Sequence, residues 1–154
     1  MKRHEIFGRV EGFPMFLMND CSIDLPKDWN DQSMNIISSN SPMAPGLTMT
    51  VTRDDLPFGM SFEEYLENQF DEVSKSMIDF TLIGRRTVKL DGVDAAEIEC
   101  SWLAKDIRLH QIIYMTPTPN GRVMVITSSM PGQMTESQGN GVRRIMQTLK
   151  FRRA

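Results

Sequence analysis

Histidine and cysteine are scarce in this sequence, which contains two of each among its 154 residues. His4 and His110 lie too far apart to form a pair at metal-ligand spacing, so no zinc site is expected. Cys21 and Cys100 are too few and too distant for a metal-binding pair, and a reducing cytoplasm leaves both as free thiols. The sequence therefore predicts no metal site.

A glycine-rich phosphate loop is also missing. Gly139 and Gly141 open a predicted helix, but no strand leads directly into them and no Lys-Ser or Lys-Thr pair follows. Glu97 and Glu99 share one face of a predicted strand and could perform acid–base chemistry, but the solvated outer face of a sheet is the favoured interpretation. Cys100 alternates with apolar residues, which favours a buried structural thiol. We expect no cofactor, and an enzyme is the least favoured class.

The sequence also lacks a large excess of charge of one sign and long apolar runs. The formal net charge is -3 and no basic block occurs, so nucleic acid is not an expected partner. No apolar run approaches the roughly 20 residues that span a bilayer, so direct membrane insertion is not expected. Glu5, Arg9 and Glu11 interrupt the apolar core that a signal peptide needs. We expect a soluble, cytoplasmic protein.

Methionine, by contrast, is abundant, with 13 residues. Its side chain is unbranched and polarizable, so it packs against differently shaped apolar partners and is common on adaptable binding surfaces. Methionine fills ordinary cores equally well, and both interpretations stay open.

Prolines, glycines and small polar residues divide the chain into short extended segments. Strands are predicted at residues 16–25, 34–38, 47–53, 80–90, 94–103, 107–115 and 123–129. Residues 34–38 and 47–53 are expected to pair as a hairpin, and Asp91 and Gly92 form a dipeptide suited to a tight hairpin turn. The later strands follow one another closely, which predicts an antiparallel meander.

Two helices complete the predicted fold. Ser61 and Glu64 form a capping-box pattern before apolar residues at helical spacing, and Thr135 and Gln138 open a second helix in the same way. The apolar stripe of this last helix consists of Val142, Ile145, Met146 and Leu149. These elements predict an α+β protein with an antiparallel meander packed against two main helices. We expect one domain over residues 16–154, after an N-terminal extension of residues 1–15.

Two glutamines break the apolar pattern. Gln69 falls on the apolar face of the first helix, between Leu66 and Val73, and alternation places Gln111 on the same strand face as Ile113. Burying an unpaired amide costs about 1–3 kcal/mol, so each glutamine needs a partner. That partner is either another group of the same protein, through an internal hydrogen bond, or a bound guest. Such a guest would be mainly apolar but would carry polar groups, as transmembrane helices do.

A tryptophan-containing stretch carries a more specific signal. Leu25 and Pro26 are followed at residues 29–36 by Trp-Asn-Asp-Gln-Ser-Met-Asn-Ile. Further matching positions follow in order: Thr52, Arg53, Asp54, Phe62, Tyr65, Gln69, Leu90, Asp91, Gly92, Trp102, Gln111 and Thr148 to Arg152. In these features the sequence resembles the Eag chaperones of type VI secretion, which belong to the wider DcrB-related, PsbP-like group. The resemblance covers most of the chain.

The resemblance implies a function for the chain and a set of client-binding residues. It implies a cytoplasmic homodimer that shields the N-terminal transmembrane helices of a PAAR-containing effector and aids its loading on the secretion spike. The client-binding positions that it implies are Met34, Ile36, Thr50, Gln69 and Gln111. Met34 and Thr50 depart from the branched aliphatic residues found at these positions in the family.

A client-free, envelope-associated or structural protein of the DcrB-related or PsbP-like group is the alternative. A processed signal or lipid-attachment motif would favour it. The residues before Cys21 are Met18, Asn19 and Asp20 rather than small apolar ones, so the sequence does not favour lipidation. The chaperone interpretation is therefore preferred over the envelope protein, and both over an enzyme.

Overall fold

The computed structural model describes residues 15–152, which fall into two compact units, one up to Gln32 and one from Ser33 onward. The expected N-terminal extension lies almost entirely outside the described residues. In the first unit, β1 (Met15–Leu17) pairs antiparallel with β2 (Ser22–Asp24). The prediction of one strand over residues 16–25 is thus wrong, because Asn19 and Asp20 favour a turn that divides it.

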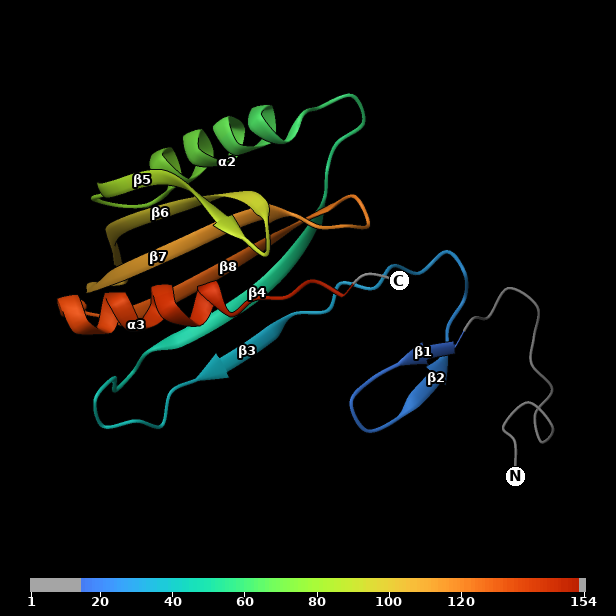
Figure 1. Cartoon of the computed structure of the whole chain (residues 1–154), viewed down its shortest axis with the longest axis horizontal. Coiled ribbons are helices and arrows are strands. Elements are labelled where there is room, and N and C mark those ends of the chain that lie inside the picture. The colour runs from blue at the N-terminus through green and yellow to red at the C-terminus, as the bar shows by residue number, and fades with distance from the viewer. Residues whose placement is uncertain (1–14, 153–154) are drawn as a thin grey trace. The chain divides into compact units, whose positions relative to one another are not determined.

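The second unit is built on a six-stranded antiparallel sheet with the order β3-β4-β8-β7-β6-β5 (Figure 1). Its strands are β3 (Asn35–Ser38), β4 (Thr48–Asp55), β5 (Thr81–Leu90), β6 (Val93–Ala104), β7 (Ile107–Pro117) and β8 (Arg122–Pro131). The predicted hairpin of β3 with β4 and the meander from β5 to β8 are both confirmed. The meander folds back so that β8 pairs with β4.

Two tight turns hold the meander in register. Asp91 and Gly92, with φ of 50° and 79°, join β5 to β6. Lys105 and Asp106, with φ of 49° and 69°, join β6 to β7. A two-residue hairpin turn that follows the twist of its strands needs positive φ at both positions, which explains the Asp-Gly pair in the first turn.

Each of the two predicted helices begins at its expected cap. In α2 (Phe62–Ser76), the hydroxyl of Ser61 accepts a hydrogen bond of 3.1 Å from the backbone N–H of Glu64. In α3 (Glu136–Gln147), Thr135 and Gln138 form a reciprocal capping box. These bonds satisfy backbone donors that the first turn of a helix leaves unpaired.

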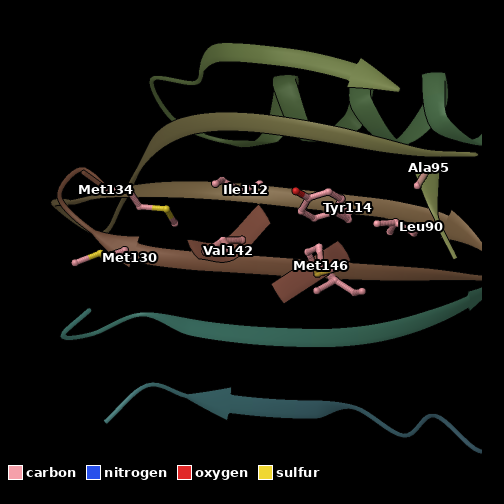
Figure 2. Packing of buried hydrophobic residues seen from close by; sticks show 9 residues of the cluster. Leu90, Ala95, Ile112, Tyr114, Met130, Met134, Val142 and Met146 are labelled. Atoms are coloured by element: carbon pink, nitrogen blue, oxygen red, sulfur yellow. The ribbon is translucent and has the colours of Figure 1, made fainter. Parts of the chain in front are cut away.

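The two helices pack on opposite faces of the sheet. On one face, Val142 and Met146 of α3 pack against Ile112 and Tyr114 of β7 (Figure 2). Further members of this buried cluster are Leu90, Ala95, Ile126, Met130 and Met134. The predicted stripe is wrong at Ile145, which is 54% exposed because it lies about 60° around the helix from Val142, at the margin of the buried stripe.

On the other face, α2 packs against β6 and β7. Phe62, Leu66 and Phe70 contact a buried cluster formed by Ile98, Cys100, Ile113 and Met115. The predicted fold is confirmed: the second unit is an α+β structure in which an antiparallel meander is covered by two helices. Because α2 sits over β6 and β7, the β3, β4 and β8 part of this face lies beside the helix, where a groove forms.

Candidate functional site: a groove between α2 and β4

A groove of about 510 Å³ runs between α2 and the exposed part of the sheet. We call it the α2 groove. Three of the five predicted client-binding residues line it, namely Thr50, Gln69 and Gln111. The remaining lining residues are Thr52, Arg53, Asp54, Tyr65, Val73, Met77, Ile113, Met115, Val125, Thr127 and Ser129. The fold therefore brings together residues that are up to 79 positions apart, from Thr50 to Ser129.

One wall of the groove is a stripe on α2. Tyr65, Gln69, Val73 and Met77 recur every four residues, so they lie above one another along the helix and its C-terminal cap. The neighbouring stripe, which contains Phe70, turns toward the sheet, and the guanidinium of Arg85 lies 4.8 Å from the Phe70 ring. The stripe that contains Phe70 thus anchors the helix to the sheet, and the stripe that contains Gln69 lines the groove.

The floor of the groove carries several hydroxyl groups, from Thr50, Thr127 and Ser129. Thr127 on β8 is paired on one side with Thr50 of β4 and on the other with Ile113 of β7. Ser129, also on β8, is paired with Gln111 of β7. Directly paired residues share a sheet face, so these side chains form one continuous surface. The floor combines apolar area with groups that donate and accept hydrogen bonds.

Gln111 is held by two internal hydrogen bonds. The indole Nε1–H of Trp102 donates to Gln111 Oε1 at 2.9 Å, and Gln111 Nε2 donates to the Ser129 hydroxyl at 2.8 Å. These bonds orient the amide of Gln111, and the residue as a whole is 7% exposed. A glutamine amide has two N–H donors and two acceptor lone pairs, so one of each stays free for a further partner.

Gln69 differs from Gln111 in its contacts. The side chain is partly buried on the groove wall, and it has no hydrogen-bond partner among residues 15–152. An amide at an apolar wall without a protein partner is satisfied by water or by a bound guest.

Met34 and Ile36 lie on the far side of the floor from α2. Ile36 is paired with Thr50, so it shares the groove face, and it is 69% exposed. Met34 precedes β3 and is 56% exposed. Neither residue lines the enclosed part of the groove, but the Ile36 side chain extends the apolar surface of its floor to the edge of the sheet.

The sequence reasoning missed several groove residues. Thr127 and Ser129 fall in the strand predicted at residues 123–129 with no functional role, and Val73 and Met77 are not among the predicted client-binding residues. Their alternation or helical spacing was visible, but the pairing of β8 with β4 was not. That pairing of strands distant in sequence is what exposes the hydroxyl groups beside the helix.

The paired carboxylates lie on the opposite face and do not form an accessible site. The expectation that Glu97 lies on a solvated face is wrong, because α3 covers it and leaves it 3% exposed. Arg143 of α3 donates to Glu97 at 3.0 Å and to Glu99 at 2.6 Å, and Arg86 and Tyr114 also donate to Glu97.

The electrostatics of this cluster favour a charged Glu97. Burial alone raises the pKa of Glu97, but the hydrogen bonds from Arg86 and Tyr114 oppose it and leave the pKa below its ordinary value. Burial and the bond to Glu97 raise the pKa of Tyr114. The cluster is thus a buried ion-pair network that joins α3 to the sheet rather than an acid–base pair.

Cys100 and His110 are also structural residues. Burial raises the pKa of the Cys100 thiol to about 11, and its side chain lies in the α2 core, as predicted. His110 lies on the other face, where Nδ1 accepts from the backbone N–H of Met134 at 2.9 Å. Its Nε2 therefore carries the proton and donates to Glu99 at 2.7 Å.

The described residues contain neither a metal-binding cluster nor a membrane-spanning helix. Within residues 15–152, no group of three His, Cys, Asp or Glu side chains is placed to hold a metal ion. No helix in that range is long and apolar enough to cross a membrane.

Comparison with known proteins places the chain in a family. The model of the family named DcrB matches residues 20–148. The chain belongs to the DcrB family. The resemblance to its Eag-type members is confirmed by a relative, effector EagT6 of Pseudomonas aeruginosa, which is 24% identical over 102 residues. That match covers 64% of this DcrB-family chain and 70% of EagT6.

Solved structures share the fold of this DcrB-family protein. A protein of unknown function from Pseudomonas aeruginosa, PA94, superposes with a TM-score of 0.73 at 20% identity, over 92% of this chain and 99% of that one. LpqN, which is involved in cell envelope biogenesis of Mycobacterium tuberculosis, gives a TM-score of 0.50 at 13% identity, over 79% and 85% of the two chains. At these identities the likeness concerns the fold alone.

Proposed function

We propose that this DcrB-family protein is a cytoplasmic, non-enzymatic chaperone of type VI secretion. It binds the N-terminal transmembrane helices of a PAAR-containing effector, shields them from water and aids loading of the effector on the secretion spike. The observation that carries the proposal is the α2 groove, in which Gln69 on an apolar wall has no protein partner among residues 15–152. Family membership and the similarity to EagT6 support it.

The chemistry of the groove suits a transmembrane helix. Such a helix is apolar over most of its surface, but its Ser, Thr and Gly positions leave hydroxyl and backbone groups that form hydrogen bonds of about 0.6–2 kcal/mol. Val73, Met77 and Ile113 supply apolar contacts. Gln69 and the free donor and acceptor of Gln111 supply polar ones.

The adaptable side chains of the site fit a guest that is not rigidly specified. Met77 and Met115 line the groove, and Met34 lies exposed beside β3. A flexible thioether side chain repacks against helices of different sequence at low cost. On this proposal the protein has no turnover and needs no cofactor.

The test is co-expression with the apolar N-terminal fragment of a PAAR effector encoded by a neighbouring gene, followed by detergent-free size exclusion. We expect a soluble complex with the wild-type protein and at least a tenfold loss of affinity, about 1.4 kcal/mol, with Gln69→Ala. Gln133→Ala is the matched control, because Gln133 is exposed between β8 and α3 and does not line the groove.

A fragment that aggregates beside wild-type protein, with every linked effector tried, would contradict the chaperone proposal and favour an envelope-associated protein without a client. Equal binding by Gln69→Ala and Gln133→Ala would contradict the assignment of the groove as the client site.

A further inference from the structure

A second cavity, of about 1000 Å³, lies on the face of the sheet that α3 covers. We call it the β4–β8 cavity. Its floor is formed by Val51 of β4 and by Met124 and Ile126 of β8. Val51 is paired with Ile126, which belongs to the buried cluster beneath α3. The walls are the turn between β7 and β8, at residues 118–120, and the chain that follows α3, at residues 149–152.

The surface of this cavity is largely apolar. Pro119, Leu149 and Phe151 add apolar side chains to those of the floor. The backbone groups of β4 and β8 bond within the plane of the sheet, so the floor presents side chains only. A hydrocarbon body needs no hydrogen-bond partner on such a floor. An extended peptide would bring one N–H and one C=O for each residue, and both need partners when they are buried.

The charged side chains of the cavity are all positive. Arg53, Lys150 and Arg152 line it, and among its described lining residues there is no Asp or Glu. The chain as a whole has a formal net charge of -3, so the cavity is a local region of opposite sign. Asp91 partly neutralises Lys150, with Oδ1 3.6 Å from Nζ. The two arginines therefore supply most of the positive charge.

Both arginines lack a carboxylate partner among residues 15–152. Nη1 of Arg53 donates to Asn35 Oδ1 at 3.0 Å and to the carbonyl of Ser33 at 3.4 Å, and both acceptors are neutral. Nε and Nη2 form another edge of the planar guanidinium, and neither bonds to a described residue. Two N–H groups on one edge match the two oxygens of a carboxylate.

Arg53 also borders the α2 groove, but its side chain belongs to the β4–β8 cavity. Alternate residues of a strand point to the same face, so the Arg53 side chain shares the face of Val51. Asn35, to which it bonds, is paired with Val51 and lies on that face too. No other described residue lines both hollows, so substitutions can affect one and spare the other.

We propose that the β4–β8 cavity binds an anionic amphiphile of the fatty-acid class. The carboxylate lies beside the guanidinium of Arg53, and the hydrocarbon chain packs on Val51 and Ile126 and against Phe151. Small-molecule sites typically have volumes of about 300–1000 Å³ and are mainly apolar with a few positioned polar groups, which is the pattern of this cavity. The inference does not rest on the proposed chaperone function.

Isothermal titration calorimetry with dodecanoate, below its micellar concentration, tests the proposal. Acetate carries the same carboxylate without the chain, and dodecyltrimethylammonium carries the same chain with the opposite charge. We expect dodecanoate to bind at least about tenfold more tightly than either control, because the site recognises both parts of the ligand. Absence of dodecanoate binding, or equal binding of either control, overturns the proposal.

Two substitutions test the assigned residues. Arg53→Gln removes the charge and should weaken dodecanoate binding at least about tenfold. Arg144→Gln is the matched control, because Arg144 is exposed on α3 and does not line the cavity. Phe151→Ala removes apolar contact, keeps the backbone N–H that bonds to Asp91, and should also weaken binding. Equal affinity in Arg53→Gln and Arg144→Gln, or an unchanged affinity in Phe151→Ala, overturns the site.

Amide chemical shifts of isotopically labelled protein locate the bound dodecanoate. We expect changes around Val51, Ile126 and Phe151 and none at Gln69 and Val73 of the α2 groove. Changes confined to the α2 groove overturn the proposal.

This proposal and the chaperone proposal fail separately. A protein that keeps the client fragment in solution but does not bind dodecanoate overturns the present inference alone. A protein that binds dodecanoate in the β4–β8 cavity but does not bind the fragment overturns the chaperone proposal alone.

Discussion

The hydroxyl of Tyr65 donates a hydrogen bond of 3.0 Å to Asp54, and this bond joins α2 to β4 at the groove. Tyr65 is 3% exposed, and burial together with the bond to Asp54 raises the pKa of Tyr65 to about 12. Both residues line the groove, so the bond connects its wall directly to its floor. The distance between α2 and β4 in this region is therefore set by the Tyr65–Asp54 hydrogen bond as well as by core packing.

In an alkaline titration, neither tyrosine should ionise at the usual tyrosine pKa. The chain has two tyrosines, and the pKa of each is raised above the usual value of about 10. Because folding raises the pKa of Tyr65, the neutral hydroxyl of Tyr65 stabilises the fold fully below the unfolded pKa near 10. This stabilisation is lost as pH rises toward 12. We expect no tyrosinate absorbance at pH 10 while circular dichroism stays native. A tyrosinate midpoint near pH 10 in folded protein would contradict the structure.

Replacing the hydroxyl isolates the contribution of Tyr65. We expect Tyr65→Phe to lower the free energy of unfolding by about 1 kcal/mol in urea at neutral pH, because one hydrogen bond is lost and Asp54 is exposed enough to be hydrated. Asp54→Asn keeps an acceptor and should cost less. An equal loss in the two variants would mean that the carboxylate charge, rather than the hydrogen bond, holds the contact.

The two glutamines should differ in their effect on stability. Gln111→Ala leaves the Trp102 indole N–H and the Ser129 hydroxyl without their partner, which costs about 1–3 kcal/mol. Gln69→Ala removes no hydrogen bond within residues 15–152 and should change the free energy of unfolding by less than about 0.5 kcal/mol. Urea unfolding of the two variants measures both values. A large loss in Gln69→Ala would show that its amide is a structural group after all.

Acid sensitivity should depend on the network beneath α3. Hydrogen bonds hold the pKa of Glu97 below its ordinary value, so its stabilisation is present above the unfolded pKa near 4.5 and is lost as pH falls below it. Arg143→Met removes the bonds to Glu97 and Glu99 and should cost about 2 kcal/mol at neutral pH. The variant should then lose less stability than the wild type on acidification.

Arg144→Met is the control for that experiment, because Arg144 is the next residue of α3 and is exposed. We expect a change within about 0.5 kcal/mol and an unaltered pH dependence. Thermal unfolding between pH 3 and pH 7 measures the difference. Identical profiles of stability against pH for the two variants would show that the network of Arg143 with Glu97 and Glu99 does not determine acid sensitivity.

Two helical glycines should respond differently to a methyl group. A Cβ at Gly141 comes no closer than 3.9 Å to its nearest neighbour, the end of Arg144, so Gly141→Ala should stabilise α3 by about 0.5–1 kcal/mol. A Cβ at Gly139 comes within 3.2 Å of Arg143 Nη1. Gly139→Ala should therefore gain less, because it disturbs the guanidinium that holds Glu97. Chemical denaturation of both variants tests the order, and a larger gain at Gly139 would contradict it.

Local patterns predicted the elements of the second unit. The caps at Ser61 and Thr135 were visible because a hydroxyl residue and a later Glu or Gln act within one helical turn. The turn at Asp91 and Gly92 was visible because positive φ selects these residue types. Alternation also separated the strand faces correctly, with Cys100 on one and Glu97 on the other.

The sequence by itself therefore determined the helices and strands of the second unit and identified Gln69 and Gln111 as polar groups on apolar faces. Only the tertiary structure decided which face each helix covers, and α3 buries Glu97 where alternation alone indicated solvent. Pairing of β8 with β4 likewise placed Thr127 and Ser129 beside α2. The reason is physical: caps and turns act over a few residues, whereas burial and groove formation depend on contacts between segments far apart in the chain, which no local pattern encodes.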